Sequence, residues 1–234
     1  MIVLILGSGP NALDCRDWPR APFDRIVAIN NAFAVRPDWD ICIFPEDFAA
    51  DRRPEPAAGQ RLVSAADYVA IQNDYGGFVY AGGTMAFTAG YWALGALRPT
   101  VLAYLGCDMT YATTGATHFY GTGAADPLRK DVTLRSLEAK SARLAVHAAE
   151  QGCAVVNLST AGESRLVFPR STPDALAGVG PMTLDPGATR RARAEEVRLG
   201  YQVPSGRYWL EEHRFDPAAI DALDAIWHGA IRSS

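Results

Sequence analysis

The sequence predicts an α/β fold: a Rossmann-like three-layer α/β/α sandwich with a mostly parallel sheet, plus a C-terminal helical appendage. Short segments that are almost continuously apolar recur along the chain, as is typical of parallel strands buried on both faces. Longer segments with helical periodicity alternate with them. This alternation favours an open sheet with right-handed crossovers. Glycines and polar residues follow several of the apolar segments, as expected for strands that end at a ligand-binding edge.

Several segments have the apolar character of strands. The first, Met1–Gly7, is a run of β-branched and aliphatic residues that ends in a Gly-Ser-Gly-Pro turn, Gly7–Pro10. We expect it to be the central strand of the sheet. The other strong segments are Arg25–Asn30, Asp40–Phe44, Thr100–Leu105 and Cys153–Leu158, and the weaker candidates are Arg61–Ser64 and Tyr68–Gln72.

Two segments within this part of the chain predict helices. Gly83–Leu97 is apolar most of the way round and stops at Arg98-Pro99. Thr133–Gln151 is amphipathic, and Gly152 is a plausible C-cap for it. Its apolar face carries Leu134, Leu137, Ser141, Leu144 and Ala148, whereas Arg135, Glu138 and Lys140 lie elsewhere.

Beyond residue 170 the composition changes. Ser171–Gly187 is rich in Pro, Gly and small residues, which is typical of a linker or surface loop. Ala188–Leu199 predicts a charged, solvated helix, and Pro217–Ile231 predicts a terminal amphipathic helix. We therefore expect a nucleotide-binding domain over residues 1–170 and, over residues 171–234, a linker and a helical appendage packed on it.

The composition excludes several classes of protein. With 49% apolar and 21% charged residues, the chain is typical of a globular protein and not of a disordered one. Its net charge of −4 disfavours a dedicated nucleic-acid binder, which usually carries a basic face. No stretch approaches the roughly 18 apolar residues of a membrane span, and Met1–Leu6 is too short for the apolar part of an export signal. We therefore expect a cytoplasmic protein.

The cysteines point away from a structural zinc site. Their spacing contains no Cys-x-x-Cys pair, and most of them sit in apolar segments. Small buried thiols are therefore expected, in the reduced state that is usual without export. The residues concerned are Cys15, Cys42, Cys107 and Cys153.

Two polar clusters follow the first two predicted strands. Glycines in the turn Gly7-Ser8-Gly9-Pro10-Asn11 would let the backbone approach a ligand, and a helix N-terminus behind them would favour a phosphate. A tight strand–helix turn explains them equally well, and Ala12 breaks the dinucleotide-binding fingerprint. Asn30-Asn31 would donate to and accept from a base or ribose, although an Asx turn or helix cap is the simpler interpretation.

Two further clusters have similar alternatives. Glu46-Asp47, past the third strand, would hold Mg²⁺ or a ligand hydroxyl, or would simply be solvated. Gly82-Gly83-Thr84, at the start of a helix, forms a second candidate anion site, and Thr84 alone would also serve as a helix cap. The Asp38-Trp39-Asp40 triplet matches the metal-binding Asp-x-Asp of many glycosyltransferases, but it precedes its strand and so lies at the wrong edge of the sheet.

The fifth cluster lies in the long loop after Thr100–Leu105. Gly106–Tyr111 contains Asp108, and His118-Phe119-Tyr120-Gly121 follows shortly afterwards. An Asp, a His and two Tyr in one rim loop suit general acid–base chemistry. A structural role for an Asp at the end of a strand remains the alternative. The other histidines, His147, His213 and His228, are expected to have packing or surface roles.

Taken in order, the five clusters resemble the superfamily shared by bacterial lipooligosaccharide sialyltransferases and MptE-like 6-hydroxymethylpterin pyrophosphokinases. In both groups a Gly-x-Gly-Pro turn follows the first strand and an Asn or Asp ends the second. A small-residue helix start then precedes a strand that closes with Gly-x-Asp-x-x-Tyr, and a His-bearing loop follows. The segments here are Gly7–Asn11, Asn30-Asn31 with Phe33, Gly82–Thr84, Gly106–Tyr111 and His118–Gly121, within roughly residues 1–170.

The resemblance to the sialyltransferases implies a metal-independent glycosyltransferase that takes a sialic-acid-like sugar from a nucleotide donor, a CMP-sugar, to a hydroxyl acceptor. Thr110 and Tyr111 would assist the leaving phosphate, and a loop His would be the general base. The family His aligns with Thr122, so His118, which matches a neighbouring His, is our candidate base, with Asp108 shaping the loop. The nucleotide-binding residues would be Gly7, Ser8, Gly9, Pro10, Asn11, Asn30, Asn31, Gly82, Gly83 and Thr84.

The other branch implies a different reaction, the ATP- and Mg²⁺-dependent pyrophosphorylation of a hydroxymethyl group such as that of a pterin. The chain is similar to it at Gly82–Thr84, at Pro37-Asp38, and at Asp47 and Asp108, which would hold the metal. Few basic residues are available for a triphosphate: Arg52, Arg53 and Arg129.

A non-catalytic nucleotide-binding module of the same fold is a third hypothesis. The partners expected are a nucleotide donor and a small-molecule or glycan acceptor, with no nucleic acid. A homo-oligomer stays open, because aromatic residues of the appendage would cover either an acceptor site or a subunit interface. These residues are Tyr201, Tyr208 and Trp209.

Overall fold

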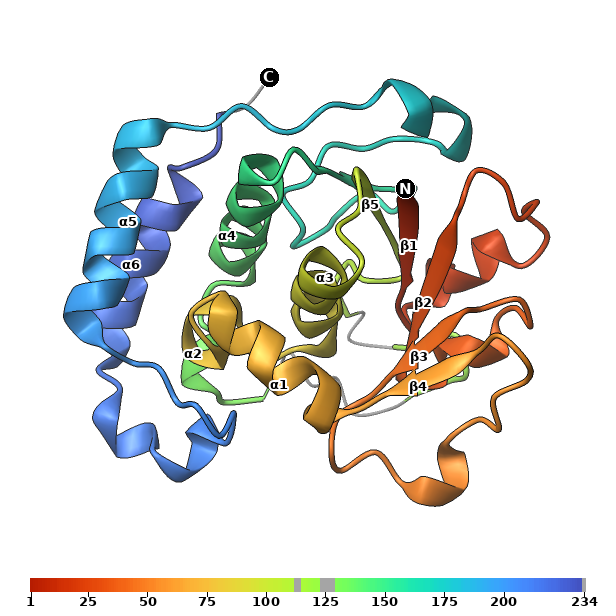
Figure 1. Cartoon of the computed structure of the whole chain (residues 1–234), viewed down its shortest axis with the longest axis horizontal. Coiled ribbons are helices and arrows are strands. Elements are labelled where there is room, and N and C mark those ends of the chain that lie inside the picture. Colours follow the sequence, from red (N-terminus) through yellow and green to blue (C-terminus); the bar gives the residue numbers. More distant parts are fainter. Residues whose placement is uncertain (112–114, 123–128, 233–234) are drawn as a thin grey trace.

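A six-stranded, all-parallel sheet forms the centre of the molecule (Figure 1). The computed structural model describes residues 1–111, 115–122 and 129–232. The strand order is β4-β3-β2-β1-β5-β6, which confirms the α/β fold class and the central place of the first strand. The strands are β1 (Ile2–Leu6), β2 (Arg25–Ile29), β3 (Ile41–Ile43), β4 (Arg61–Val63), β5 (Val101–Leu105) and β6 (Ala154–Asn157).

The central strand β1 is buried on both faces, as its continuous apolar sequence predicts. It pairs with β2 on one side and with β5 on the other, with Leu4 opposite both Ile26 and Ala103. Val3 and Ile5 point into the core beneath the long helices, whereas Leu4 and Leu6 point into a second core on the opposite face. Side-chain alternation along a strand therefore divides one apolar segment between two cores.

The two faces of the sheet are covered by different kinds of helix. The longer helices, with the short α2, lie on one face, where α3 runs beside the sheet in Figure 1. The opposite face is covered by short 3₁₀ helices and loops, in which Ala12, Ala32 and Leu176 are buried. The helices of the first face are α1 (Ala65–Asp74), α2 (Phe78–Ala81), α3 (Met85–Ala96) and α4 (Leu137–Glu150), and the 3₁₀ helices include Pro10–Cys15, Asn30–Ala34 and Pro173–Gly178.

One strand prediction is wrong. The segment Tyr68–Gln72 belongs to helix α1, not to a strand. A capping box starts this helix, since the N–H of Ser64 donates to the carboxylate of Asp67 at 2.9 Å. Tyr68 and Gln72 are then one helical turn apart and both buried, so they lie on the same, inward face of the helix. The weaker strand at Arg61–Ser64 is confirmed as β4.

The start of α4 also differs from the prediction. The helix begins after Ser136, whose hydroxyl accepts from the N–H of Ala139. Thr133 instead lies in a 3₁₀ turn, because Asp131 accepts hydrogen bonds from its N–H and its hydroxyl. At the other end Gly152 has a φ of +73° and follows the last turn, which confirms it as the glycine that ends the helix.

The C-terminal appendage covers the second face of α4. It consists mainly of α5 (Pro186–Leu199) and α6 (Pro217–His228), which lie beside α4 in Figure 1. The Lys140 ammonium lies 2.7 Å from a carboxylate oxygen of Asp224 on α6, and both side chains are buried. Arg143 likewise pairs with Glu196 on α5 at 2.6 Å. The polar side of α4 is therefore an interior surface, and its charges are paired as buried ions must be.

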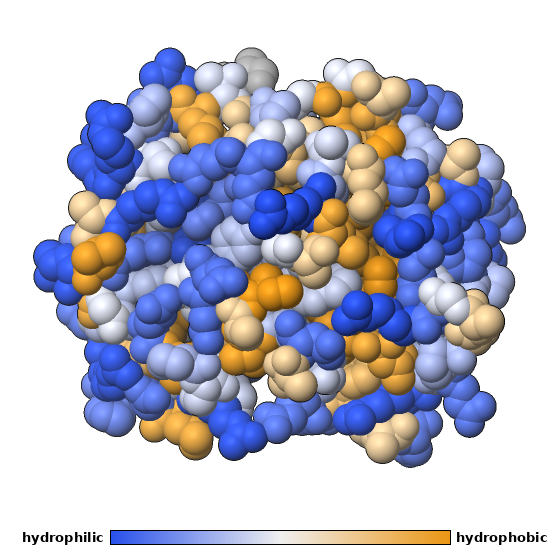
Figure 2. Space-filling view, in the orientation of Figure 1, coloured by the Kyte–Doolittle hydropathy of each residue, from blue (hydrophilic) through white to orange (hydrophobic). Residues whose placement is uncertain are grey.

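The outer surface of α5 is the charged, solvated face that its sequence predicts. Its inner side buries Ala188, Thr189 and Ala192, while Arg190, Arg191 and Arg198 are exposed. Hydrophilic side chains dominate the left side of Figure 2, where α5 lies.

Among the helices of the described residues, none has the length and apolar character of a membrane-spanning segment. All four cysteines are buried free thiols, as expected.

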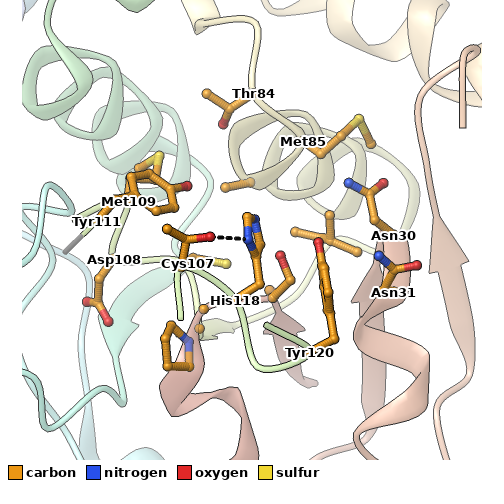
Figure 3. A pocket seen from close by; sticks show the side chains of 18 of the residues that line it. Asn30, Asn31, Thr84, Met85, Cys107, Asp108, Met109, Tyr111, His118 and Tyr120 are labelled. Atoms are coloured by element: carbon orange, nitrogen blue, oxygen red, sulfur yellow. Dashed lines mark hydrogen bonds between the residues drawn. The ribbon is translucent and has the colours of Figure 1, made fainter. Parts of the chain in front are cut away.

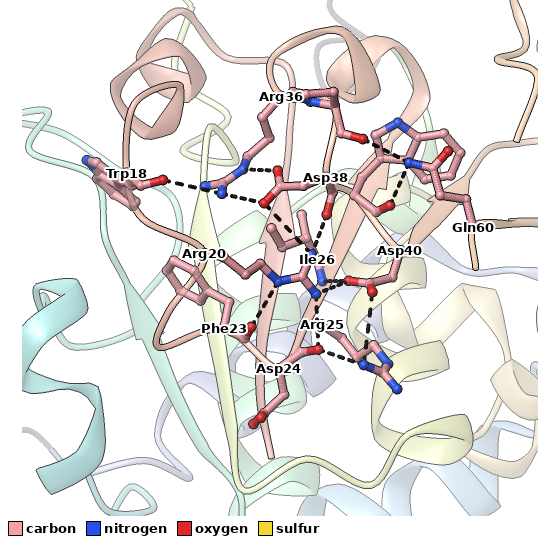
Figure 4. A network of polar contacts seen from close by, with 12 residues as sticks. Trp18, Arg20, Phe23, Asp24, Arg25, Ile26, Arg36, Asp38, Asp40 and Gln60 are labelled. Atoms are coloured by element: carbon pink, nitrogen blue, oxygen red, sulfur yellow. Dashed lines mark hydrogen bonds and ion pairs between the residues drawn. The ribbon is translucent and has the colours of Figure 1, made fainter. Parts of the chain in front are cut away.

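The Asp-x-Asp triplet lies at the amino edge of the sheet, as its position before β3 predicts (Figure 4). Arg36 donates to both carboxylate oxygens of Asp38, at 2.6 and 2.8 Å. Asp40 accepts from Arg20 at 2.6 Å and from the N–H of Ile26 at 2.7 Å. These carboxylates hold the loops at the start of β2 and β3.

We predict that His147 makes the stability of the protein sensitive to mild acid. The ring is enclosed by Tyr75, Tyr91 and Trp227, and burial, together with the charges of Arg143 and Arg193, lowers its pKa well below the ordinary value of 6.5. Below about pH 6.5, His147 is therefore protonated in the unfolded chain but stays neutral in the folded chain. The free energy of unfolding should fall by about 1 kcal/mol from this group between pH 6.5 and 5.5.

Urea denaturation at these two pH values checks this prediction. The His147→Phe variant, which keeps an aromatic ring but cannot titrate, should lose less stability than the wild type over this interval. His213→Gln, at an exposed histidine, should behave as the wild type does. An equal loss in the His147→Phe variant and the wild type would contradict the prediction.

Candidate functional site

A cavity of about 650 Å³ opens at the carboxyl ends of the central strands. This is the edge at which open parallel sheets bind their ligands, and the volume suits a nucleotide-sized molecule. Most of the site residues predicted from sequence meet here. Those that line the cavity are Gly7, Ser8, Gly9, Pro10, Asn11, Asn30, Asn31, Asp47, Thr84, Asp108, Thr110, Tyr111 and His118.

The glycine turn after β1 is shaped by the turn after β5. The N–H of Gly7 donates to Leu105 O and that of Gly9 to Gly106 O, each at 2.8 Å. A Cβ on Gly7 would lie 2.3 Å from the Gly106 oxygen, which is too close for any side chain. Both glycine N–H groups are therefore engaged within the protein. The element that follows is a six-residue 3₁₀ helix beginning at Pro10, so no long helix supports a phosphate cradle at this turn.

The N-terminus of α3 is the helix end that opens onto the cavity. Thr84 caps it by accepting from the N–H of Phe87, and Thr84, Met85 and Ala86 all line the cavity wall. The first N–H groups of a helix have no intrahelical acceptor, and the helix dipole favours an anion there. The predicted anion site at this helix start therefore reduces to Thr84 and the two residues after it.

Gly82 and Gly83 do not line the cavity. The N–H of Gly83 donates to Thr133 Oγ1 at 2.9 Å, and a Cβ on this residue would lie 2.2 Å from the hydroxyl of Tyr208. A Cβ on Gly82 would meet the side chains of Phe87 and Lys140. The small size of Gly83 lets the chain pass close to Tyr208 of the appendage, and that of Gly82 lets it pass close to α3 and α4.

His118 is held over the glycine turn by a tight hairpin. His118 and Gly121 exchange backbone hydrogen bonds, and the N–H of Phe119 donates to Ser8 O at 3.0 Å. The Nδ1 of His118 lies 2.9 Å from Thr117 Oγ1. The imidazole is only 8% exposed, and in Figure 3 it points across the cavity toward Thr84 and the start of α3. The hairpin thus fixes both the place and the direction of the ring.

Position 122, where the resembled family has its base, is placed differently. The Thr122 hydroxyl donates to Gly115 O at 3.1 Å, and the residue does not line the cavity. Thr110 and Tyr111 do line it, and the Tyr111 ring lies 6.1 Å from that of His118. Of the two candidate positions for a base, His118 is the one that faces the ligand space.

Asp108 organises the loops around the cavity. Its two carboxylate oxygens accept hydrogen bonds from the side-chain amides of Asn11, at 2.8 Å, and Asn157, at 2.9 Å. Burial alone would raise the pKa of Asp108, but hydrogen bonds from Ser159, Asn157, Ser164 and Asn11 outweigh it and lower the pKa. In Figure 3 the carboxylate points away from His118. Asp108 is therefore ionised and structural, in keeping with the loop-shaping role expected of it.

The partners of Asp108 at the end of β6 are not among the residues predicted from sequence. Asn157 ends β6, and its Nδ2 also donates to Ser164, while its Oδ1 accepts from the N–H of Ser159. These bonds hold the loop that brings Glu163 to the cavity. The signal was present, because Asn157 ends its strand just as Asn30 follows β2.

Asn30 and Asn31 form the wall opposite His118 in Figure 3. Asn30 has a φ of +52°, and Met109, also lining the cavity, has one of +55°. Such left-handed backbone is uncommon outside glycine and tends to gather at functional sites. The Oδ1 of Asn30 is buried and has no hydrogen-bond partner among the described residues. This unsatisfied oxygen is covered by protein atoms and is not open to the cavity.

The charges that line the cavity are more acidic than basic. Asp47, Glu163 and Asp108 carry carboxylates, and Arg52 is the one lysine or arginine among the described residues of the lining. The guanidinium of Arg52 lies 5.1 Å from the ring of Phe48. Arg53 instead donates twice to Phe48 O, and Arg129 donates to Asp131 and Tyr208. Of the basic residues considered from sequence, only Arg52 therefore lines the cavity.

Comparison with protein-family models, with curated proteins and with solved structures finds no match to this chain.

Binding of a metal ion would require a suitable group of side chains at the cavity or elsewhere in the chain. In the described part of the chain, no group of three or more His, Cys, Asp or Glu side chains is arranged to hold a metal ion. Asp47 and Asp108 both line the cavity, but the oxygens of Asp108 already accept amide hydrogen bonds.

We predict that Gly7→Ala strongly destabilises the protein. The added methyl group would collide with the backbone oxygen of Gly106 and with Cys107 Sγ, and neither can move without separating the turns after β1 and β5. Overpacking of this kind should lower the free energy of unfolding by at least about 2 kcal/mol, measured by urea denaturation. Gly180→Ala is the matched control, because nothing lies within 4 Å of its Cβ position. A Gly7→Ala variant as stable as this control would contradict the prediction.

Proposed function

We propose that this chain is a glycosyltransferase-like enzyme that binds a nucleotide-activated sugar in the cavity and transfers the sugar to a hydroxyl acceptor. One observation carries the proposal: the ring of His118 faces the N-terminus of α3 across a cavity of nucleotide size. A helix N-terminus favours the phosphate of a donor, and a histidine facing it is suited to remove a proton beside that phosphate.

The donor phosphate would lie between the first turn of α3 and Arg52. The N–H groups of Met85 and Ala86 would donate to its oxygens, and the guanidinium would add a charged contact. The nucleoside would extend toward Asn30 and Asn31, whose side-chain amides both donate and accept. Gly7 and Gly9 would shape the floor of the cavity without donating to the phosphate, because their N–H groups are engaged.

Transfer would proceed by direct displacement at the anomeric carbon. His118 takes the proton of the acceptor hydroxyl, and the hydroxyl oxygen forms the new bond to that carbon as the bond to the phosphate oxygen breaks. The nucleotide leaves with the electron pair of the broken bond. The α3 N-terminus, Arg52, and the hydroxyls of Thr110 and Tyr111 would stabilise the negative charge that develops on the phosphate.

A second candidate is the ATP-dependent pyrophosphokinase. The observation in its favour is that Asp47 and Asp108 both line the cavity, as does Thr84 at the start of α3. The single arginine of the described lining would have to serve a triphosphate together with Mg²⁺. The two candidates differ in whether nucleotide binding needs the metal.

A ligand-melting screen separates them. CMP or UMP, as probes of the donor's nucleotide, should raise the melting temperature equally with and without Mg²⁺. Arg52→Ala should weaken this binding about tenfold or more, as expected for the loss of a charged hydrogen bond. Arg190→Ala, at an exposed arginine of α5, is the control and should have no effect. Stabilisation by ATP alone, and only with Mg²⁺, would overturn the glycosyltransferase proposal in favour of the kinase.

The role of His118 is tested by turnover. His118→Gln should lower the rate of nucleotide release from a nucleotide-sugar donor about 10²- to 10⁴-fold, with nucleotide affinity retained. Thr122→Ala is the informative control, because position 122 holds the base in the resembled family but does not line the cavity here. It should keep near wild-type turnover. Loss of turnover in Thr122→Ala but not in His118→Gln would overturn the assignment of the base.

A further inference from the structure

Tyr120 is an aromatic residue of the cavity lining whose side chain is exposed. Its side chain is 49% exposed although the residue lines the cavity. It lies on the same hairpin as His118, and the two rings stack with centroids 4.9 Å apart and planes inclined by 19°. The hairpin is fastened to the turn after β1 through Phe119, so the Tyr120 ring has a defined place and direction.

One face of this ring is covered and the other looks into the cavity. Figure 3 shows Tyr120 standing between His118 on one side and Asn30 and Asn31 on the other. The ring face turned away from His118 therefore looks toward the two asparagine side chains. Between them lies part of the cavity, bounded by an aromatic face and by amide groups.

The chemistry of these two walls defines the ligand that fits between them. A planar aromatic ring would stack on Tyr120 and bury apolar surface that is now exposed, while its polar edge would reach the asparagines. The side-chain amides of Asn30 and Asn31 belong to the cavity lining and would hydrogen-bond to such an edge. A phosphate alone, or a sugar without a base, offers no aromatic face to this wall.

We propose that Tyr120 is the stacking platform for the nucleobase, which lies between it and Asn30 and Asn31. This assignment deepens the proposed function, on which it rests. It orients the ligand, with the base at the asparagine wall and the phosphate at the N-terminus of α3. The hairpin then has two roles, because one short segment positions both the nucleobase of the ligand, through Tyr120, and the general base His118.

The test compares ligands with and without a nucleobase. Isothermal titration of the full chain with CMP, UMP and AMP should show tighter binding than with ribose 5-phosphate. Tyr120→Leu should weaken nucleotide binding about 5- to 150-fold, the range expected for loss of one stacked base. Its affinity for ribose 5-phosphate should change by less than about twofold. Tyr120→Phe, which keeps the ring, should bind nucleotides nearly as the wild type does.

The controls separate this inference from the function on which it rests. Trp209→Leu removes a comparably exposed aromatic residue, 52% exposed, that does not line the cavity, and should leave binding unchanged. If the wild type binds no nucleotide, the proposed function itself fails. If it binds nucleotides and Tyr120→Leu binds them equally well, only the platform is overturned. Equal weakening of nucleotides and ribose 5-phosphate in Tyr120→Leu would also overturn it, because it would indicate a displaced hairpin instead of a lost stacking contact.

Discussion

The site depends on the close contact of two turns, one after β1 and one after β5. Gly7 and Gly106 approach so closely that a methyl group on Gly7 would overlap a backbone oxygen, and two backbone hydrogen bonds join the turns. The backbone oxygen of Ser8 accepts a hydrogen bond from the hairpin that carries His118. The side-chain amide of Asn11 donates to the carboxylate of Asp108. A cavity forms at this edge because the glycines let the turns meet with no side chains between them.

The C-terminal appendage is joined to the same architecture through buried charges. Lys140 and Arg143 on α4 find their carboxylate partners on α6 and α5, and removal of either partner would leave an unpaired ion in the interior. Such pairs fix which helix faces meet. The appendage also approaches the site, because the Tyr208 hydroxyl donates to Asp131 and packs against Gly83, next to the cap of α3.

The glycine turn after β1 and the helix N-terminus at the cavity belong to different parts of the chain. The glycine turn follows β1 and lines the cavity floor. The helix N-terminus that opens onto the cavity is that of α3, which comes between β4 and β5 in the chain. Asn30 and Met109, which have left-handed backbone, both belong to the cavity lining. Polar residues of the cavity lining and the glycines that shape the turns therefore lie along the same edge of the sheet.

Local sequence patterns suffice to predict the six strands in chain order, the burial of β1 and the edge at which the polar residues gather. Strand periodicity is local, and parallel strands necessarily bring their carboxyl ends together, so Asn31, Thr84 and His118 meet as predicted. The neighbours of each residue depend instead on the three-dimensional fold. Local pattern could not show that Lys140 meets Asp224, that Gly83 lies beneath Tyr208, or that Tyr120 faces the asparagines, because each contact joins segments far apart in the chain. The prediction for Tyr68–Gln72 was wrong for a related reason: a short, mostly apolar run fits a strand or a helix, and here the capping box at Ser64 starts a helix.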